Sequence, residues 1–283
     1  MKAPAFAYAR PGSLDEAYTL LDAHRGEAKV LAGGQSLMPA LNMRLASPRL
    51  LVDINTLPGL DTIVRNGETL RIGALARHRA IERSTQVSET LPLLAQAMPH
   101  IAHVAIRNSG TIGGSLAYAD PAAEIPAVAV ALDATIVVGS SAGERRIPAR
   151  SFFRALFETA LEANELILAV EFPLTPDYRS VFCELARRHG DYAVVGLAVH
   201  AHVTRKRLSD VRLAFLGGGA TPRLANRAAA VLTGRDCDAD CIEDAVRALA
   251  DDLDPLPDLY HQRATKLHLA GVLLRRAAAQ LIH

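Results

Sequence analysis

Glycine and hydroxyl-bearing residues gather in two short segments of the 283-residue chain. The first segment comprises Ala32, Gly33, Gly34, Gln35, Ser36 and Leu37, and the second comprises Gly110, Thr111, Ile112, Gly113, Gly114 and Ser115. Glycine allows a positive φ and lets another molecule lie flat against the backbone. Successive main-chain N–H groups in such a turn form an anion-binding nest, to which hydroxyl groups add donors. Both segments are therefore predicted to bind a phosphate or pyrophosphate.

The surroundings of the two glycine segments narrow the kind of ligand. No lysine follows the glycines, as a P-loop requires, and their spacing differs from the dinucleotide fingerprint of the Rossmann fold. For either segment taken alone, glycines that only make tight turns are the alternative. Because each segment follows an apolar run, the pair favours a cofactor with two phosphates that lies across a domain.

Two carboxylates, Asp120 and Glu124, follow the second glycine segment. Because they stand beside a glycine turn, we expect them to accept hydrogen bonds from hydroxyl groups of the ligand. For Asp120 the alternative is a carboxylate that is stabilised by the dipole at a helix N-terminus.

Composition argues against several other classes of function. The net charge of +1 and the lack of a basic run with aromatics give no nucleic-acid signal. No signal peptide and no apolar stretch of about 20 residues is found, so no membrane span is expected and the protein is predicted to be cytoplasmic. The three cysteines, Cys183, Cys237 and Cys241, are too few for an iron–sulfur cluster, and the ten histidines lack metal-ligand spacing.

Hydrophobic periodicity predicts an α+β protein with an N-terminal domain over residues 1–175. A first subdomain, about 1–56, is expected to contain strands at 6–8, 30–32 and 50–54. Its helices begin after Ser13, which forms a capping box with Glu16, and at Leu37, with apolar spacing through Leu45. The second subdomain, 57–175, is expected to contain a hairpin across Asn66-Gly67 and a helix over 122–132, with Pro121 in the first turn.

Prolines at 173 and 176 mark a domain boundary, after which residues 176–283 form a second domain. Strands are predicted at 192–203 and 211–216. Helices are predicted at 223–232, 239–249 and about 259–281. Strands followed by helices indicate an α+β layer structure.

Three motifs in this order, at 32–37, 110–114 and 120–124, resemble the FAD-binding medium subunit of molybdenum hydroxylases. This family includes the medium subunit of carbon monoxide dehydrogenase and the flavoprotein of xanthine dehydrogenase. The segment 187–193 (RRHGDYA) is similar to the family's start of the C-terminal domain. Tyr260, Arg263 and the final helix are similar to its end, so the resemblance covers nearly the whole chain.

The resemblance implies a two-part FAD-binding fold of the p-cresol methylhydroxylase/vanillyl-alcohol oxidase type, followed by a small C-terminal α+β domain. Residues 32–36 and 111–115 would surround the pyrophosphate of non-covalent FAD through backbone amides and hydroxyls. Glu124 would contact the ribityl chain, with Asp120 close by. Ile101 would pack on the flavin ring, Tyr192 would lie on its other side, and Asp191 would orient that loop.

The resemblance also implies partners. A small subunit would bring [2Fe-2S] clusters, a large subunit would bind molybdopterin, and electrons would leave for NAD, quinone or oxygen. Cys183 and Glu184 stand in a region where relatives often carry a lysine. The alternatives are a self-contained flavin-dependent reductase of the same fold, like the one that makes UDP-N-acetylmuramate, and a non-catalytic nucleotide-binding or scaffold subunit.

Overall fold

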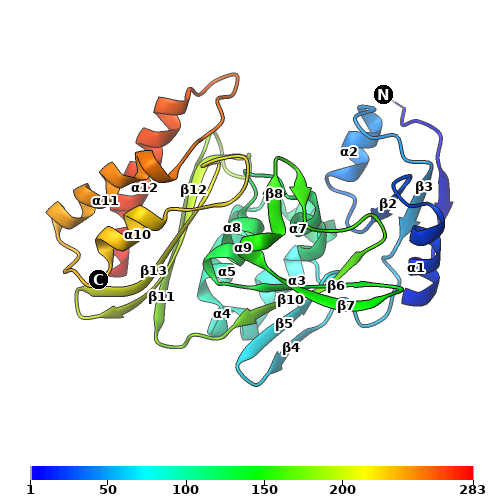
Figure 1. The fold of residues 1–283 in the computed structure, drawn as a ribbon, viewed down its shortest axis with the longest axis horizontal. Helices are drawn as coiled ribbons and strands as arrows, with labels where there is room; N and C mark the ends of the chain where they lie inside the picture. Colours follow the sequence, from blue (N-terminus) through cyan, green and yellow to red (C-terminus); the bar gives the residue numbers. More distant parts are fainter. Residues whose placement is uncertain (1, 283) are drawn as a thin grey trace.

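The computed structural model describes residues 2–282, which form three lobes along the longest axis of the molecule (Figure 1). The N-terminal lobe runs from β1 (Ala7–Ala9) to β3 (Leu50–Asp53), the central lobe from β4 (Ile63–Asn66) to β10 (Leu166–Pro173), and the C-terminal lobe from β11 (Tyr178–Ala186) to α12 (Arg263–Leu281). The outer limits of the predicted domains, positions 1 and 283, lie outside the described residues. Within residues 2–282, no helix combines the length and the apolar character needed to cross a membrane.

The N-terminal lobe surrounds a parallel three-stranded sheet of order β1-β3-β2. Its other elements are α1 (Leu14–Ala23), β2 (Ala28–Leu31) and α2 (Leu37–Asn42). The Ser13 hydroxyl caps α1 by accepting a hydrogen bond from the Glu16 N–H, which confirms the predicted helix start. Because β2 and β3 are parallel neighbours, the segments that follow them leave the sheet at the same edge.

The central lobe is built on an antiparallel five-stranded sheet of order β4-β5-β10-β6-β7. Its other strands are β5 (Thr69–Gly73), β6 (Thr135–Ser140), β7 (Gly143–Pro148), β8 (Phe153–Ala155) and β9 (Glu158–Thr159). Its helices are α3 (His78–Arg83), α4 (Thr85–Thr90), α5 (Pro92–Ala97), the 3-10 helix η1 (Met98–His100), α6 (Val104–Ser109), α7 (Ile112–Tyr118), α8 (Glu124–Ala131) and α9 (Ala149–Phe152). The pairing of β4 with β5 confirms the predicted hairpin across Asn66-Gly67.

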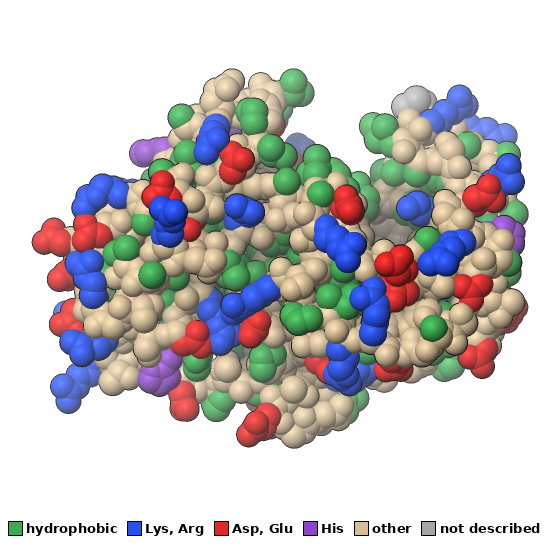
Figure 2. All heavy atoms as spheres, in the orientation of Figure 1, with side chains coloured by type: hydrophobic (Ala, Val, Ile, Leu, Met, Phe, Trp, Pro, Cys, Tyr) green, Lys and Arg blue, Asp and Glu red, His purple; other side chains and the backbone are tan. Residues whose placement is uncertain are grey.

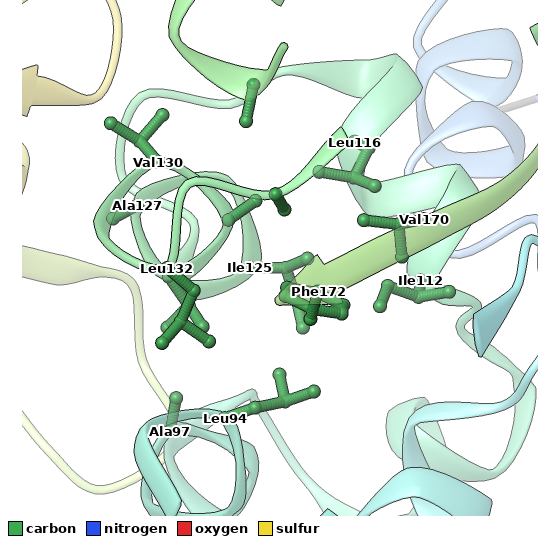
Figure 3. Packing of buried hydrophobic residues seen from close by; sticks show 14 of the residues in the cluster. Leu94, Ala97, Ile112, Leu116, Ile125, Ala127, Val130, Leu132, Val170 and Phe172 are labelled. Carbon is green, nitrogen blue, oxygen red and sulfur yellow. The ribbon is translucent and has the colours of Figure 1, made fainter. Parts of the chain in front are cut away.

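The core of the central lobe lies between its sheet and its helices. Figure 3 shows Ile112 and Leu116 of α7 close to Val170 and Phe172 of β10. Every residue of α8 is buried, including Glu124 at its first position. A helix that is apolar on all sides has to be enclosed by other elements. Here α5 and the strands of the C-terminal lobe enclose α8.

The C-terminal lobe is an antiparallel sheet of order β11-β12-β13-β14 with three helices. Its remaining elements are β12 (Ala193–Thr204), β13 (Arg207–Leu216), β14 (Arg223–Leu224), α10 (Asn226–Leu232) and α11 (Ala239–Asp252). The helices pack on one face of the sheet, and α8 with α5 packs on the other. Helices and strands form separate layers in this lobe, which confirms the predicted α+β class.

Several predicted helix boundaries are wrong. The helix expected through Leu45 ends at Asn42, and Leu45 is exposed. The α8 helix begins at Glu124, so Pro121 precedes the helix instead of lying in its first turn. Residues 223–224 form β14, and residues 259–262 precede α12. Helix ends depend on capping and tertiary contacts, which apolar spacing does not encode.

Candidate cofactor site

The loop between β2 and α2 leaves its backbone donors free. Within residues 2–282, the N–H groups of Gly33, Gly34, Gln35 and Ser36 donate no hydrogen bond to a protein acceptor. Gly34 has a φ of +71°, a conformation that glycine adopts without strain. The Gln35 side chain donates to the Gly33 carbonyl over 2.9 Å and closes the turn. The loop therefore supplies the free donors that an anion-binding nest requires.

The second glycine segment is the start of a helix. Thr111 caps α7, because its hydroxyl accepts from the Gly114 N–H and its carbonyl accepts from the Ser115 N–H. In the described chain, Gly110, Gly113 and Gly114 all lie outside the positive-φ region. The positive φ that glycine allows is therefore not used at this segment.

Close packing explains the glycines of this second segment. The N–H groups of Ile112 and Gly113 donate to the carbonyls of Ala76 and Ala74 over 3.1 and 2.9 Å. A Cβ atom on Gly113 would lie 2.6 Å from the Ala74 Cβ and 2.8 Å from the Ala74 carbonyl oxygen. Glycine is thus required for the approach of α7 to the chain that follows β5, and these two N–H groups are already used within the protein.

The two glycine segments meet at the boundary between the N-terminal and central lobes. A Cβ atom on Gly33 would clash with the Ser109 carbonyl and would lie 2.8 Å from the Gly110 Cα. The Arg77 guanidinium donates to the same Ser109 carbonyl and, over 2.6 Å, to Oδ1 of Asn55. Asn55 in turn donates from Nδ2 to the Ala32 carbonyl over 2.8 Å. Arg77 and Asn55 therefore tie the first loop to the second segment.

A surface hollow lies at this meeting point. It has a volume of about 300 Å³ and is lined by Ala32, Gly33, Asn55, Arg77, Asn108 and Ser109. A second hollow of about 290 Å³ shares Asn55 and Arg77 with the first. Figure 2 shows the surface hollowed between the N-terminal lobe and the central lobe. The hollow, the free N–H groups and the Arg77 guanidinium together suit an anionic ligand.

Four residues of this hollow are absent from the predicted site. Asn108 and Ser109 directly precede the second glycine segment, and the pattern offered no reason to include them. Asn55 follows a strand of a parallel sheet, a position where ligands often bind, so it could have been found. Arg77 has no sequence signal, because its contacts join segments that are distant in the chain.

A second group of predicted residues gathers where the central and C-terminal lobes meet. Ile101 is buried at the end of η1, and its carbonyl accepts from the Arg107 guanidinium over 2.9 Å. A Cβ atom on Gly190 would lie 2.9 Å from the Ala102 carbonyl oxygen, so the β11–β12 loop packs on this turn. The same loop carries Asp191, whose carboxylate accepts from the backbone N–H of the next residue over 3.1 Å.

The remaining predicted residues, Asp120, Glu124 and Tyr192, have pKa values that are raised by burial and by nearby charges. Burial, with smaller contributions from the carboxylates of Glu184 and Asp120, raises the pKa of Glu124 to about 8. Burial also raises the pKa of Asp120, whose Oδ1 accepts from the Ala122 N–H over 2.9 Å. Burial and then nearby Asp120 raise the pKa of Tyr192, although this side chain is largely exposed. With its pKa raised to about 8, Glu124 is mostly protonated at pH 7, and in this form it can donate as well as accept hydrogen bonds.

Helix α7 connects the two groups. Its seven residues make it about 10 Å long. Thr111 at its start adjoins the meeting point of the glycine segments, and Tyr118 at its end lies close enough to influence the pKa of Tyr192. The arrangement suits an extended ligand with an anionic part at one end of α7 and a polar, protic part at the other. Among residues 2–282, no group of three or more His, Cys, Asp or Glu is placed to hold a metal ion.

Comparisons with known proteins identify the family of the chain. A family described as the FAD binding domain in molybdopterin dehydrogenase matches residues 4–175, and the CO dehydrogenase flavoprotein C-terminal domain matches residues 180–281. The 6-hydroxypseudooxynicotine dehydrogenase complex subunit alpha of Paenarthrobacter nicotinovorans is 40% identical, covering 100% of this chain and 96% of the relative. Caffeine dehydrogenase subunit beta of Pseudomonas sp. (strain CBB1) is 36% identical, covering 99% of this chain and 96% of the relative.

A solved structure, carbon monoxide dehydrogenase from Hydrogenophaga pseudoflava lacking the Mo-pyranopterin moiety of its cofactor, shares the fold. The TM-score is 0.96 at 35% identity, covering 99% of this chain and 98% of that chain. These matches confirm the predicted FAD-binding fold with its small C-terminal domain, and they confirm FAD as the cofactor. The chain belongs to the family of FAD-binding medium subunits of molybdenum hydroxylase-type oxidoreductases, which includes the carbon monoxide dehydrogenase medium chains.

Proposed function

We propose that this chain is the electron-transfer subunit of a molybdenum-containing hydroxylase or dehydrogenase complex. A large molybdopterin-binding subunit oxidises the organic substrate, and a small subunit delivers the electrons through [2Fe-2S] clusters. The present chain passes them to an external acceptor, which is NAD, a quinone or oxygen. The observation that carries the proposal is the loop of free N–H groups at 33–36, which borders the hollow beside Arg77.

The residues of this chain divide the binding of FAD between two places. The loop 32–37 takes the pyrophosphate through its free N–H groups, and Arg77 and Asn55 hold the loop against the start of the second segment. The segment 110–115 supports this end mainly through packing and the Ser115 hydroxyl. When bound, FAD supplies redox chemistry in steps of one or two electrons.

At the other end of α7, Ile101 and Tyr192 enclose the ring of FAD. Glu124, mostly protonated because its pKa is raised to about 8, exchanges hydrogen bonds with the ribityl hydroxyls, and Asp120 lies close by. Asp191 orients the loop that carries Tyr192. Residues 1–175 therefore form the FAD-binding domain, and residues 176–283 contribute the loop that closes over the ring.

An anaerobic absorbance experiment with the isolated FAD-loaded subunit tests the proposal. Dithionite should bleach the flavin, and air should restore its colour. A panel of aromatic N-heterocycles, aldehydes and carbon monoxide should leave it oxidised until the large and small subunits are added. Prompt bleaching by any of these compounds without partners would favour the self-contained flavoenzyme, and a colourless purified chain that takes up no FAD would contradict the site itself.

The non-covalent attachment of FAD is tested by denaturation. Heat or acid should release the flavin into the supernatant. Yellow colour that stays with the precipitated protein would contradict this part of the proposal.

A further inference from the structure

A buried carboxylate with one unsatisfied oxygen lies at the boundary between the central and C-terminal lobes. Glu184 is on β11, and its side chain is 5% exposed. Its Oε1 lies 3.3 Å from Nδ1 of His100, the last residue of η1. Its Oε2 is buried and has no hydrogen-bond partner among the described residues. Such a carboxylate is costly to bury unless a proton or a positive charge compensates it.

Glu184 influences two neighbouring groups in the same direction. Its hydrogen bond to His100 raises the pKa of that imidazole. Its negative charge adds to the burial that raises the pKa of Glu124 to about 8. His100 and Glu124 therefore form a cluster with Glu184, here called the proton cluster, in which Glu184 favours the protonated form of the other two.

Other titratable groups act on the proton cluster or adjoin it in the chain. Asp120 raises the pKa of Glu124, and His100 lowers it. Glu124 in turn contributes to the raised pKa of Tyr192. Cys183 adjoins Glu184 in the chain, and burial raises the pKa of its thiol to about 11, so it is uncharged at neutral pH. The His100 side chain is 35% exposed and provides a route to solvent.

The position of the cluster relates it to the cofactor, and this step rests on the proposed function. His100 directly precedes Ile101, and Glu124 is the residue assigned to the ribityl chain. Adding electrons to the nearby ring brings negative charge, and a nearby negative charge raises the pKa of every acidic group around it. Protonation of the cluster and reduction of the ring are therefore coupled.

We propose that the proton cluster takes up one proton from solvent when the neighbouring flavin is reduced, and that Glu184 is the residue that positions this uptake. Reduction follows FAD + 2 e⁻ + H⁺ → FADH⁻, with electrons from the small subunit or from dithionite. The ring thereby gains one negative charge. A second proton, from water through His100, then protonates Glu124 or His100, so that two electrons are accompanied by two protons.

The pH window follows from the direction of the shifts. Below about pH 8, Glu124 is already protonated in the oxidised protein and cannot take up another proton. Proton uptake by Glu124 on reduction of the flavin therefore appears only as the pH rises above about 8. His100 responds in the same way above its own raised pKa. Because Glu184 raises both pKa values, Glu184→Gln should move the uptake to lower pH.

Redox potentiometry of the full FAD-loaded chain between pH 6 and 9.5 measures this uptake. The slope of midpoint potential against pH gives the protons taken up for every two electrons, and free FAD gives the reference. We expect the wild type to exceed free FAD by up to one proton above about pH 8. In Glu184→Gln this excess should shift downward in pH, and in Glu184→Asp, which keeps the charge, it should remain near the wild-type position.

Glu171→Gln is the matched control, because Glu171 of β10 is a partly buried carboxylate paired with Arg71 of β5 and Arg146 of β7. It should leave the slope unchanged. His100→Gln, which removes one protonatable group of the cluster, should reduce the excess and serves if Glu184→Gln fails to fold. Equal slopes in wild type, Glu184→Gln and His100→Gln, with flavin fully bound, would overturn this inference alone. A wild type that binds no flavin would instead contradict the proposed function.

Discussion

The loop 32–37 and the segment 110–115 contain similar residues but use their backbone donors differently. In the loop, the N–H groups of Gly33 to Ser36 have no acceptor within the described chain. In the segment, those of Ile112 and Gly113 bind the carbonyls of Ala76 and Ala74, and the segment starts a helix. The loop therefore keeps its donors available, whereas the segment uses two of its donors to bind the protein's own backbone.

The two segments show that similar glycine patterns can have different structural causes. Glycine predicts that something approaches the backbone closely, but it does not say what approaches. At Gly113 the neighbour is Ala74, and at Gly33 it is Ser109, so the two segments also depend on each other. Substitutions that disturb the packing of the segment 110–115, or the free donors of the loop 32–37, but not both, test whether the two segments have different roles.

The largest effect is expected from Gly113→Ala. The new Cβ would lie 2.6 Å from the Ala74 Cβ and 2.8 Å from its carbonyl oxygen, and neither can move freely. Overpacking of this kind costs about 1–3 kcal/mol, and more when backbone is involved. Urea unfolding of the apoprotein should show the loss even without FAD. An unchanged unfolding midpoint would mean that α7 does not depend on this close approach.

Gly33→Ala should act mainly on the cofactor. Its Cβ would push the loop away from Ser109 and Gly110 and so displace the free N–H groups. We expect flavin affinity to fall at least about tenfold, equivalent to about 1.4 kcal/mol, with a smaller change in unfolding than for Gly113→Ala. Gly12→Ala is the control, because its Cβ would meet only the Glu16 carboxylate at 3.7 Å. Full flavin content in Gly33→Ala would remove this glycine from the site.

Arg77→Ala should separate the two segments without adding bulk. It removes the hydrogen bonds to the Ser109 carbonyl and to Asn55. Hydrogen bonds to a charged group contribute about 1.5–3 kcal/mol, so both unfolding stability and flavin affinity should decrease. Arg65→Ala, which removes an exposed arginine that donates to the Gly67 carbonyl within the β4–β5 hairpin, should leave the flavin affinity unchanged. Fluorescence titration with FAD measures the affinity, and equal values for the two variants would contradict the bridging role of Arg77.

The smallest effect is expected from Ser36→Ala, which removes one hydroxyl and leaves its N–H group in place. One hydrogen bond contributes about 1 kcal/mol, so affinity for FAD should fall several-fold. The same titration measures it. A complete loss of binding would show that side-chain hydroxyls, rather than backbone donors, carry the site.

Sequence patterns predicted the parts of the fold that rest on local physics. The cap at Ser13, the hairpin at Asn66-Gly67 and the buried strands all have signals within a few residues. Five strands, β7, β8, β9, β11 and β14, were not predicted. The β7 strand (GERRIP) is a charged, exposed edge strand, and β11 carries Arg179 and Glu184 after a proline-rich break, so neither shows a clear apolar pattern.

Only part of the candidate site was predicted, because sequence patterns reveal local features and not contacts between distant segments. The residues near 32–37 and 110–115 were found because glycine patterns are local. Arg77 and Asn55 could not be assigned their bridging roles, because those roles exist only when the N-terminal and central lobes meet. The half-satisfied carboxylate of Glu184 likewise results from the packing of β11 on η1.

Hydrogen–deuterium exchange with and without FAD distinguishes the two glycine segments. The free N–H groups of the loop 33–36 are proposed to bind the phosphates, whereas those at the start of α7 are already used within the protein. Peptides that cover 32–37 should exchange rapidly in the apoprotein and slow markedly when FAD is added, while peptides that cover 112–118 should exchange slowly in both states. Slowing confined to 112–118, with 32–37 unchanged by FAD, would contradict the account.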